Sequence, residues 1–260
     1  MSQYLTDLAL AQEAADVADD VSLPGFQQRG FTVERKADKS EVTEIDRATE
    51  LAISSLLRAQ RPADSVYGEE HGVVGPTDAT RQWVIDPIDG TSNFVRGVPV
   101  WASLIALVEN DVPVVGVVSA PALGMRWWAA LGHGAHHNGK RITVSNESEL
   151  HRASASITVN ESWHSAGKTA PLAALQRNVS RLRNYGDFWQ HMLVAQGAVD
   201  FAVDAIGLGP YDIAALAAIV TQAGGKWSDR HGEQNWRSDS FITSNGRLHG
   251  AVLSALESDR

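Results

Sequence analysis

The 260-residue sequence contains no cysteine, and this absence excludes several kinds of site. Without thiols there can be no disulfide, no cysteine nucleophile and no cysteine-based zinc centre. A formal net charge of −9 argues against a nucleic-acid partner, which usually requires a basic surface. The longest apolar run, residues 98–108, is too short to span a bilayer. We therefore expect a soluble protein that binds neither nucleic acid nor membranes.

Three sequence signals are also missing. The first residues show no basic region followed by an apolar run, so no signal peptide is expected, and the lack of cysteine fits a cytoplasmic location. No Gly-x-Ser-x-Gly elbow is present, which disfavours a serine hydrolase of that type. No Gly-x-x-x-x-Gly-Lys-Ser/Thr loop is present either, which disfavours nucleotide hydrolysis by a P-loop.

The first part of the chain predicts two helices packed on an antiparallel sheet. Helical spacing of apolar residues begins at Leu5, and we expect Pro24-Gly25 to end this first helix. Residues 31–41 are charged and suggest a hairpin or a mobile loop. Thr43 can cap a second helix that runs to about Arg61. Its expected buried face is Ile45, Ala48, Leu51, Ala52, Ser55 and Leu56.

The strands of this first part are bounded by turn residues. Asn110-Asp111 and Asn138-Gly139 are typical of tight turns between strands. We expect His133-Gly134-Ala135-His136-His137 to be a solvated Gly-rich loop, and it is assigned no site because no carboxylate accompanies it. The predicted strands are residues 65–67, 100–108, 112–119, 125–130 and 141–144.

From about residue 150 strands and helices alternate, which predicts an α/β half. No linker separates the two parts, so we expect an α+β subdomain over residues 1–148 and an α/β subdomain over residues 149–260 that share one core. The expected strands of the second part are 154–159, 181–185, 199–203 and 225–228, and its helices are 169–177, 187–196, 211–222 and 245–256.

One segment carries most of the chemical information. Residues 83–94 begin as an apolar strand that ends in Asp86 and Asp89, and Gly90-Thr91-Ser92 follow directly. Carboxylates are hard oxygen ligands of the kind that Mg²⁺ prefers. The backbone after them can open a helix, whose first amides suit a phosphate. Metal and phosphate sites are therefore expected side by side, which indicates metal-dependent phosphate chemistry.

Two further acidic residues stand out by their context. Glu69 follows a predicted strand, and Asp212 lies at the start of an apolar helix. Carboxylates from separate elements that meet at one point repel each other unless cations hold them together. Two metals roughly 4 Å apart could activate water and stabilise a leaving oxygen. The alternative, ordinary capping and surface aspartates, is the common case for one residue but not for Asp86-Pro87-Ile88-Asp89-Gly90-Thr91 as a unit.

Residues 83–96 resemble the first signature of the inositol monophosphatase family of Mg²⁺-dependent, Li⁺-sensitive phosphatases. Glu69, in Gly-Glu-Glu, is similar to the family's metal-binding glutamate. Residues 211–215, followed by Gly224-Gly225, resemble the second signature, although Tyr211 stands where the family usually has tryptophan. The resemblance runs from about residue 36 to residue 256. It implies the family's layered αβαβα sandwich, a homodimer, and an active site completed by residues 149–260.

The resemblance also implies a role for each matching residue. Two or three Mg²⁺ ions would bind in each active site, with a third, weaker one near Glu69. The first would be held by Glu69, Asp86 and the carbonyl of Ile88. The second would be held by Asp86, Asp89 and Asp212.

The same resemblance implies the catalytic and phosphate-binding groups. Asp46 would pair with Thr91 to orient and help deprotonate the attacking water, which makes Asp46, Glu69 and Thr91 the catalytic candidates. The backbone amides of Gly90 and Thr91, with Ser92 beside them, would hold the phosphate oxygens. The metal ligands Glu69, Asp89 and Asp212 would border the bound substrate.

Weaker signals bear on the substrate. Residues 36–43, 119–130 and 186–193 resemble the histidinol-phosphatase branch of the family. Histidinol phosphate carries an ammonium and an imidazole, so its site should offer a free carboxylate and an aromatic wall. Asp187-Phe188-Trp189 can supply both. Our hypothesis is that Asp187 binds the cationic end and Arg183 lies near the phosphate. The alternative makes Asp187 a helix cap and Phe188-Trp189 part of the core.

The sequence therefore predicts a Mg²⁺-dependent phosphomonoesterase whose partner is a small phosphorylated substrate. The leading interpretation is hydrolysis of L-histidinol phosphate in histidine biosynthesis. An inositol-1-phosphatase, or a phosphatase for a broad range of sugar phosphates, is the alternative within the same family. A non-catalytic phosphate-binding module is disfavoured because every expected metal ligand is present, together with Asp46 and Thr91.

Overall fold

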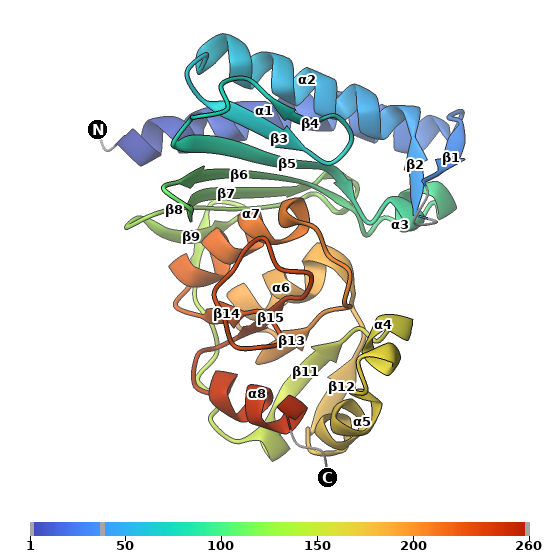
Figure 1. The fold of residues 1–260 in the computed structure, drawn as a ribbon, viewed down its shortest axis with the longest axis vertical. Coiled ribbons are helices and arrows are strands. Elements are labelled where there is room, and N and C mark those ends of the chain that lie inside the picture. Colours follow the sequence, from blue (N-terminus) through green and yellow to red (C-terminus); the bar gives the residue numbers. More distant parts are fainter. Residues whose placement is uncertain (1–2, 37–39, 258–260) are drawn as a thin grey trace.

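The computed structural model describes residues 3–36 and 40–257, and these form alternating helical and sheet layers (Figure 1). Helices α1 (Gln3–Gln28) and α2 (Glu44–Gln60) cover one face of an eight-stranded sheet. Helices α6 (Asp187–Ala195) and α7 (Pro210–Gln222) lie between that sheet and a five-stranded one. Helices α5 (Thr169–Arg177) and α8 (His249–Glu257) cover the outer face of the smaller sheet. This arrangement is the layered αβαβα sandwich that the sequence predicts.

The larger sheet is antiparallel except where β3 pairs with β5. Asn110 and Asp111 both have positive φ, at 48° and 67°, so they form the tight turn that the sequence predicts between β6 and β7. In sheet order the strands are β10 (Lys140–Ile142), β9 (Gly134–His137), β8 (Met125–Ala130), β7 (Val112–Ala120), β6 (Ala102–Glu109), β5 (Arg81–Asp89), β3 (Ser65–Gly68) and β4 (Gly72–Val74).

The expected Gly-rich loop at residues 133–137 is wrong. Residues 134–137 form β9, which pairs with β8 so that His137 lies opposite Trp127. The two rings are stacked with their centroids 4.6 Å apart. Burial of these flat side chains against each other favours a strand over a solvated loop.

The smaller sheet combines two kinds of pairing. Its first three strands are parallel, as the alternation of strands and helices predicts, and the last two pairs are antiparallel. The sequence misses α4 (Glu161–Ser165) and β15, and it is wrong to begin the last helix at Asn245. The three residues of β15 are buried between β13 and β14, and α8 begins only at His249. The strand order is β12 (Arg181–Arg183), β11 (Ser154–Ile157), β13 (Phe201–Val203), β15 (Ile242–Ser244) and β14 (Lys226–Ser228).

Helix α1 does not end at Pro24 but continues to Gln28. Proline inside a helix removes one hydrogen bond and costs about 3 kcal/mol. Phe26, in the turn after this proline, packs against two aromatic rings, 5.5 Å from that of Phe94 and 5.4 Å from that of Trp101. The last turn of α1 is therefore held by aromatic packing against the segment that carries the Asp-Gly-Thr motif.

Helix α2 begins after the Thr43 cap, as predicted, but its buried face is only partly the predicted one, with Ile45 and Leu56 packed against hydrophobic clusters. Ala48 and Ser55 are exposed, and the side chain of Leu51 is 61% exposed. The buried face is shifted towards the polar residues of the helix, which contact the motif loops described below, so hydrophobic spacing alone gives only one edge of that face. The buried residues are Asp46, Thr49, Glu50, Ile53 and Leu57.

A short hairpin, β1 (Val33–Arg35) and β2 (Glu41–Thr43), precedes α2. It confirms the hairpin alternative for residues 31–41, of which residues 37–39 lie outside the described residues. The predicted boundary at residues 148/149 falls in the connection between the two sheets, and the division into two subdomains stays a prediction.

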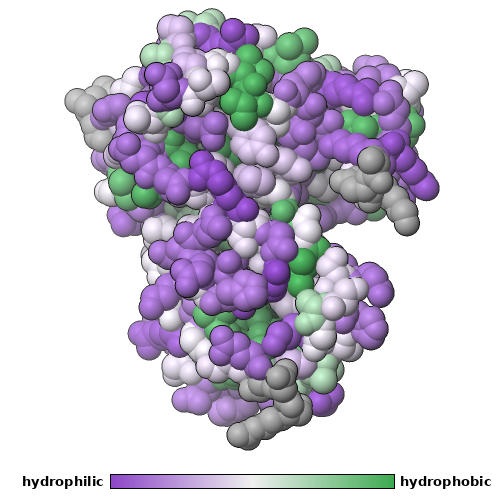
Figure 2. All heavy atoms as spheres, viewed as in Figure 1, coloured by the Kyte–Doolittle hydropathy of each residue, from purple (hydrophilic) through white to green (hydrophobic). Residues whose placement is uncertain are grey.

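The face of the molecule in Figure 2 is mostly hydrophilic, with apolar side chains scattered among polar ones. Within residues 3–36 and 40–257, none of the helices combines the length and the apolar character that crossing a membrane requires.

Candidate active site

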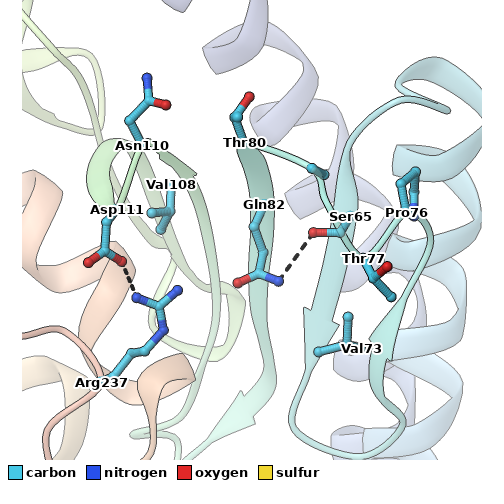
Figure 3. A pocket seen from close by; sticks show the side chains of 11 residues that line it. Ser65, Val73, Pro76, Thr77, Thr80, Gln82, Val108, Asn110, Asp111 and Arg237 are labelled. Carbon is cyan, nitrogen blue, oxygen red and sulfur yellow. Dashed lines mark hydrogen bonds and ion pairs between the residues drawn. The ribbon is translucent and has the colours of Figure 1, made fainter.

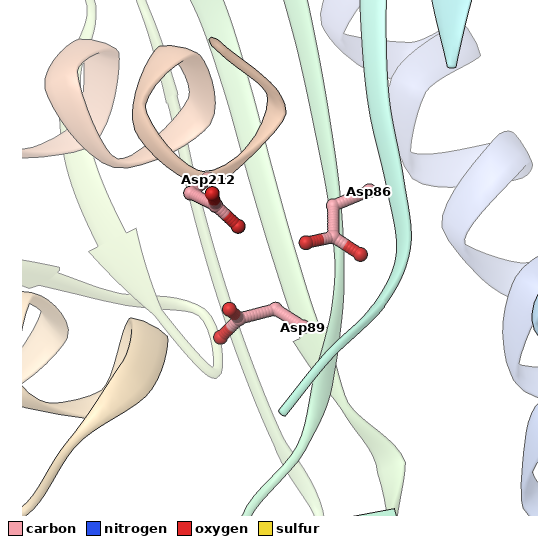
Figure 4. A group of neighbouring side chains, drawn as sticks. All are labelled: Asp86, Asp89 and Asp212. Atoms are coloured by element: carbon pink, nitrogen blue, oxygen red, sulfur yellow. The ribbon is translucent and has the colours of Figure 1, made fainter. Parts of the chain in front are cut away.

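Three aspartates from two elements meet at the junction between the larger sheet and the central helices. Asp86 and Asp89 end β5, and Asp212 lies in the first turn of α7. One carboxylate oxygen from each lies within 4.8 Å of the others. Figure 4 shows the three carboxylates gathered between the end of β5 and the start of α7. We call these residues the aspartate cluster.

A β-bulge makes this cluster possible. Residues three apart on a regular strand point to opposite faces of the sheet. Here Asp86 pairs with Leu104 and Asp89 pairs with Ala102, so β5 contains one residue more than β6 over this interval. Pro87, which has no N–H to give to the ladder, lies inside the bulge. The extra residue brings both carboxylates to the same side.

The carboxylates of the cluster destabilise each other's charged forms. Burial raises the pKa of Asp86 well above its usual value, and the nearby charges of Glu69, Asp89 and Asp212 raise it further. Burial raises the pKa of Asp212 to about 7, although the Gly209 N–H donates to its Oδ2 at 2.6 Å. Hard oxygen donors, close spacing and mutual repulsion fit a divalent cation such as Mg²⁺.

Glu69 lies beside the aspartate cluster, but its carboxylate is hydrogen-bonded to a lysine. Its charge acts on Asp86, yet its Oε1 accepts a hydrogen bond from Lys36 Nζ at 2.7 Å. The same ammonium donates to Glu70 Oε1 at 2.6 Å. Lys36 directly follows β1, and the sequence assigned it no role. The ammonium group of Lys36 is thus paired with the glutamate that we predicted as a metal ligand.

The predicted pair of Asp46 and Thr91 is in contact. Thr91 Oγ1 lies 3.0 Å from Asp46 Oδ1 and 2.9 Å from the carbonyl oxygen of Ile88. Asp46 is fully buried at the start of α2, and its Oδ2 accepts hydrogen bonds from the N–H and the hydroxyl of Thr43 at 2.8 and 2.5 Å. Burial raises the pKa of the Asp46 carboxyl, which makes it a stronger base.

The start of α3 (Thr91–Arg96) follows directly. Gly90 has φ of 83°, and a Cβ there would lie 3.0 Å from the carbonyl oxygen of Val100, so both conformation and space require glycine. The exposed Ser92 turns its hydroxyl to Glu41 Oε2 at 3.0 Å. Phosphate binding by the amides of Gly90 and Thr91, or by Ser92, stays a prediction.

Asp187 lies next to the aspartate cluster. The N–H of Phe188 donates to Asp89 Oδ2 at 2.7 Å, and Asn93 Nδ2 donates to Asp187 Oδ2 at 2.9 Å. Gly186, not Asp187, has the capping position of α6. Burial and the charge of Asp204 raise the pKa of Asp187 to about 6.

The expected aromatic wall is wrong at Phe188 and stays a prediction at Trp189. Phe188 is 1% exposed and belongs to the core, as the alternative interpretation holds. Trp189 is partly buried. Arg183 is exposed on the edge strand β12, where its Nη1 donates to the carbonyl oxygen of Leu182 at 2.6 Å. Its place near the phosphate stays a prediction.

A separate cavity lies at the other end of β5. It has a volume of about 530 Å³, and Gln82, Asp111 and Arg237 are among its lining residues (Figure 3). Gln82 is four residues before Asp86, which corresponds to about 13 Å along a strand. Asp111 also lines the cavity, and its carboxylate is paired with Arg237. Within the described part of the chain, the lining of this cavity therefore offers no cluster of ligands for a metal.

The comparisons with known proteins agree over almost the whole chain. The model of the inositol monophosphatase family matches residues 3–259. The chain is 46% identical to a histidinol-phosphatase from Streptomyces coelicolor, over 98% of each protein. It is also 46% identical to a histidinol-phosphatase from Mycobacterium tuberculosis, over 96% of this chain and 97% of that protein. A solved inositol monophosphatase from Anabaena superposes with a TM-score of 0.86 at 28% identity, over 98% and 96%.

Proposed function

The chain belongs to the inositol monophosphatase family and is a phosphatase, and we propose that it hydrolyses L-histidinol phosphate to L-histidinol and phosphate. The observation that supports this substrate is the position of Asp187. It places a further negative charge beside the aspartate cluster, where the leaving group of a bound phosphate ester would lie. The two relatives named histidinol-phosphatase support the same substrate.

We further propose that the cofactor is Mg²⁺, with two or three ions in each active site. Asp86, Asp89 and Asp212 would hold it, and Glu69 and the carbonyl of Ile88 would complete the ligand set. When bound, Mg²⁺ would neutralise the phosphate and stabilise the charge that develops on the attacking and leaving oxygens. The repulsion within the aspartate cluster supports this proposal, because only a cation relieves it without protonation.

The protein's own residues would move the proton of the attacking water. The water donates to Thr91 Oγ1, and the hydroxyl proton of Thr91 passes to Asp46 Oδ1 as the water oxygen attacks phosphorus. The fixed position of Asp46 supports this path, because Thr43 occupies its other oxygen. The leaving oxygen takes its proton from solvent. Gly90, Thr91 and Ser92 would hold the phosphate from the start of α3.

Charge explains why a histidinol ester suits this site better than a neutral sugar ester. Histidinol carries an ammonium and an imidazole, whereas inositol carries only hydroxyl groups. Among the described residues Asp187 accepts one hydrogen bond, from Asn93, and burial and the charge of Asp204 destabilise its charged form, so a substrate cation would gain a desolvated ionic contact there. We propose Asp187 for this cation and Arg183 for the phosphate side.

A phosphate-release panel tests the proposal. Histidinol phosphate, inositol 1-phosphate and fructose 1,6-bisphosphate are compared with and without Mg²⁺. We expect a preference of at least about a hundredfold in kcat/KM for histidinol phosphate, equivalent to about 2.7 kcal/mol. A preference for inositol 1-phosphate, or equal rates, would instead assign the alternative within the family. No release from any ester with Mg²⁺ present would point to a non-catalytic module.

We also propose that the enzyme acts in histidine biosynthesis and forms a homodimer, as the resemblance implies, and that it does so in the cytoplasm, which the lack of cysteine fits. Light scattering after size exclusion measures the oligomer directly. A mass of twice 28.0 kDa is the expected result.

A further inference from the structure

A carboxylate outside the predicted site holds the backbone around Glu69. Glu50 lies on α2 and is 1% exposed. Its Oε2 accepts the N–H of Glu70 at 2.7 Å, and its Oε1 accepts the N–H of His71 at 2.9 Å. The ring of His71 adds a contact from Nδ1 to Oε1 at 2.8 Å. A buried carboxylate is costly unless it is hydrogen-bonded in this way.

Gly68 shows how closely Glu50 approaches the other side of Glu69. A Cβ at residue 68 would lie 2.2 Å from the carboxyl carbon of Glu50. Gly68 does not have positive φ, so glycine is required here for space rather than for conformation. Glu50 therefore contacts the residue before Glu69 and binds the residue after it. The backbone of the predicted metal ligand is fixed from both sides.

Helix α2 connects this contact with the water-activating pair. Asp46 and Glu50 are four residues apart, so they lie on one face of the helix, one turn from each other. Asp46 binds Thr91 at the start of α3, and Glu50 binds the turn after β3. Because this shared face packs against the motif loops, α2 buries Asp46 and Glu50, whereas Ala48 and Ser55, which hydrophobic spacing predicted to be buried, are exposed.

We propose that Glu50 is a positioning residue that orients Glu69 for cation binding by clamping residues 68–71 to α2. The inference rests on the proposed role of Glu69 in the phosphatase site. Glutamate is needed because both of its oxygens accept hydrogen bonds from N–H groups. A glutamine has one acceptor oxygen, and its NH₂ group would face one of those N–H donors.

Calorimetric titration with Mg²⁺ tests the proposal without relying on turnover. Wild type, Glu50→Gln and Asp64→Asn are compared in the full chain. Asp64 is the matched control because it is a buried acid at the other end of β3, where it accepts a hydrogen bond from Trp83 Nε1 at 3.0 Å. Thermal unfolding of each variant measures the loss of stability independently.

We expect Glu50→Gln to weaken Mg²⁺ binding by about tenfold or more, as loss of a residue that orients a metal ligand usually does. Asp64→Asn should lose stability but keep wild-type Mg²⁺ affinity. Unchanged affinity in Glu50→Gln, or an equal loss in Asp64→Asn, would overturn the proposal. If Glu50→Gln does not fold, Glu50→Asp keeps the charge but shortens the clamp, and the same two outcomes decide.

Failure of the proposed function gives a different pattern. In that case wild type itself releases no phosphate in the ester panel, whatever the result for Glu50. If wild type is active and Mg²⁺-dependent while Glu50→Gln binds Mg²⁺ normally, only the positioning role is wrong.

Discussion

Thr91 at the start of α3 is hydrogen-bonded to Asp46 on α2, 45 residues earlier in the chain, with 3.0 Å between Oγ1 and Oδ1. The contact joins the motif loop to a helix on the outer layer of the sandwich. Asp46 cannot turn away, because Thr43 binds its other oxygen. A threonine in this position has a fixed acceptor for its proton.

Replacing Thr91 by valine keeps the shape of the side chain and removes the hydroxyl. We expect kcat to fall by about 10²–10⁴, the usual size of a lost general-base contribution. Mg²⁺ affinity, measured by calorimetry, should stay near that of wild type because no proposed ligand side chain changes. Thr91→Ser keeps the hydroxyl and should retain most of the activity. Similar rates for Thr91→Val and wild type would exclude the proposed proton path.

Local signals predicted part of the fold correctly. The cap at Thr43 and the turn at Asn110-Asp111 depend on residues adjacent in the chain, and both are present in the structure. The motif of Asp86, Asp89 and Gly90-Thr91 predicted one shared metal site, and the structure does bring the two carboxylates together. Their spacing of three predicts opposite faces on a regular strand, and the bulge that corrects it has no sequence signal beyond Pro87.

The contacts that were missed depend on tertiary structure. In the sequence Glu50 is an ordinary helical glutamate, and its contacts with Glu70 and His71 arise only because the turn after β3 packs against α2. Lys36 and Asn93 likewise gain meaning only through Glu69 and Asp187, which are distant in sequence. Hydrophobic spacing predicted only one edge of the buried face of α2, because the buried carboxylates of Asp46 and Glu50 carry no hydrophobic signal.

Asp89 connects the cluster to α6, and its charge can be removed at nearly constant shape. Asp89→Asn should keep an acceptor for the N–H of Phe188 while it loses a charged ligand. We expect phosphatase activity to fall by at least about a hundredfold. Wild type should gain roughly 2.7 kcal/mol of stability at a Mg²⁺ concentration 100 times the dissociation constant, and the variant much less.

Asp111→Asn is the control for the Asp89 variant, because it also removes one carboxylate but lies beside the distant cavity. It should show the wild-type response to Mg²⁺ in thermal unfolding. Normal turnover by Asp89→Asn would contradict the proposed ligand set.

The proposed role of Asp187 in binding the substrate cation is best tested by replacing it with asparagine. Its φ is 47°, a left-handed conformation that asparagine adopts more easily than alanine. Asp187→Asn also keeps an oxygen for Asn93, so only the charge is lost. We expect KM for histidinol phosphate to rise by about tenfold or more, since a charged hydrogen bond contributes about 1.5–3 kcal/mol. KM for an uncharged phosphate ester such as inositol 1-phosphate should change little, and equal effects on both substrates would remove Asp187 from substrate recognition.

The raised pKa values give the metal-free protein a distinctive dependence on pH. The carboxyl of Asp212 has a pKa of about 7 in the folded chain against an ordinary value of 3.8, and that of Asp187 has a pKa of about 6. The folded state therefore holds these protons more tightly than the unfolded state does. Their contribution to stability is complete below pH 3.8 and is lost as the pH rises towards 7.

Thermal unfolding with and without Mg²⁺ isolates this contribution from other titrating groups. The difference in Tm between the two conditions should grow from pH 4 to pH 7, because Mg²⁺ binds the deprotonated cluster and replaces its protons. Asp212→Asn carries no charge at that position, so its metal-free Tm should fall less over the same range. A Tm difference that stays constant from pH 4 to pH 7 in wild type would contradict cation binding by these carboxylates, since proton release and cation binding are then not linked.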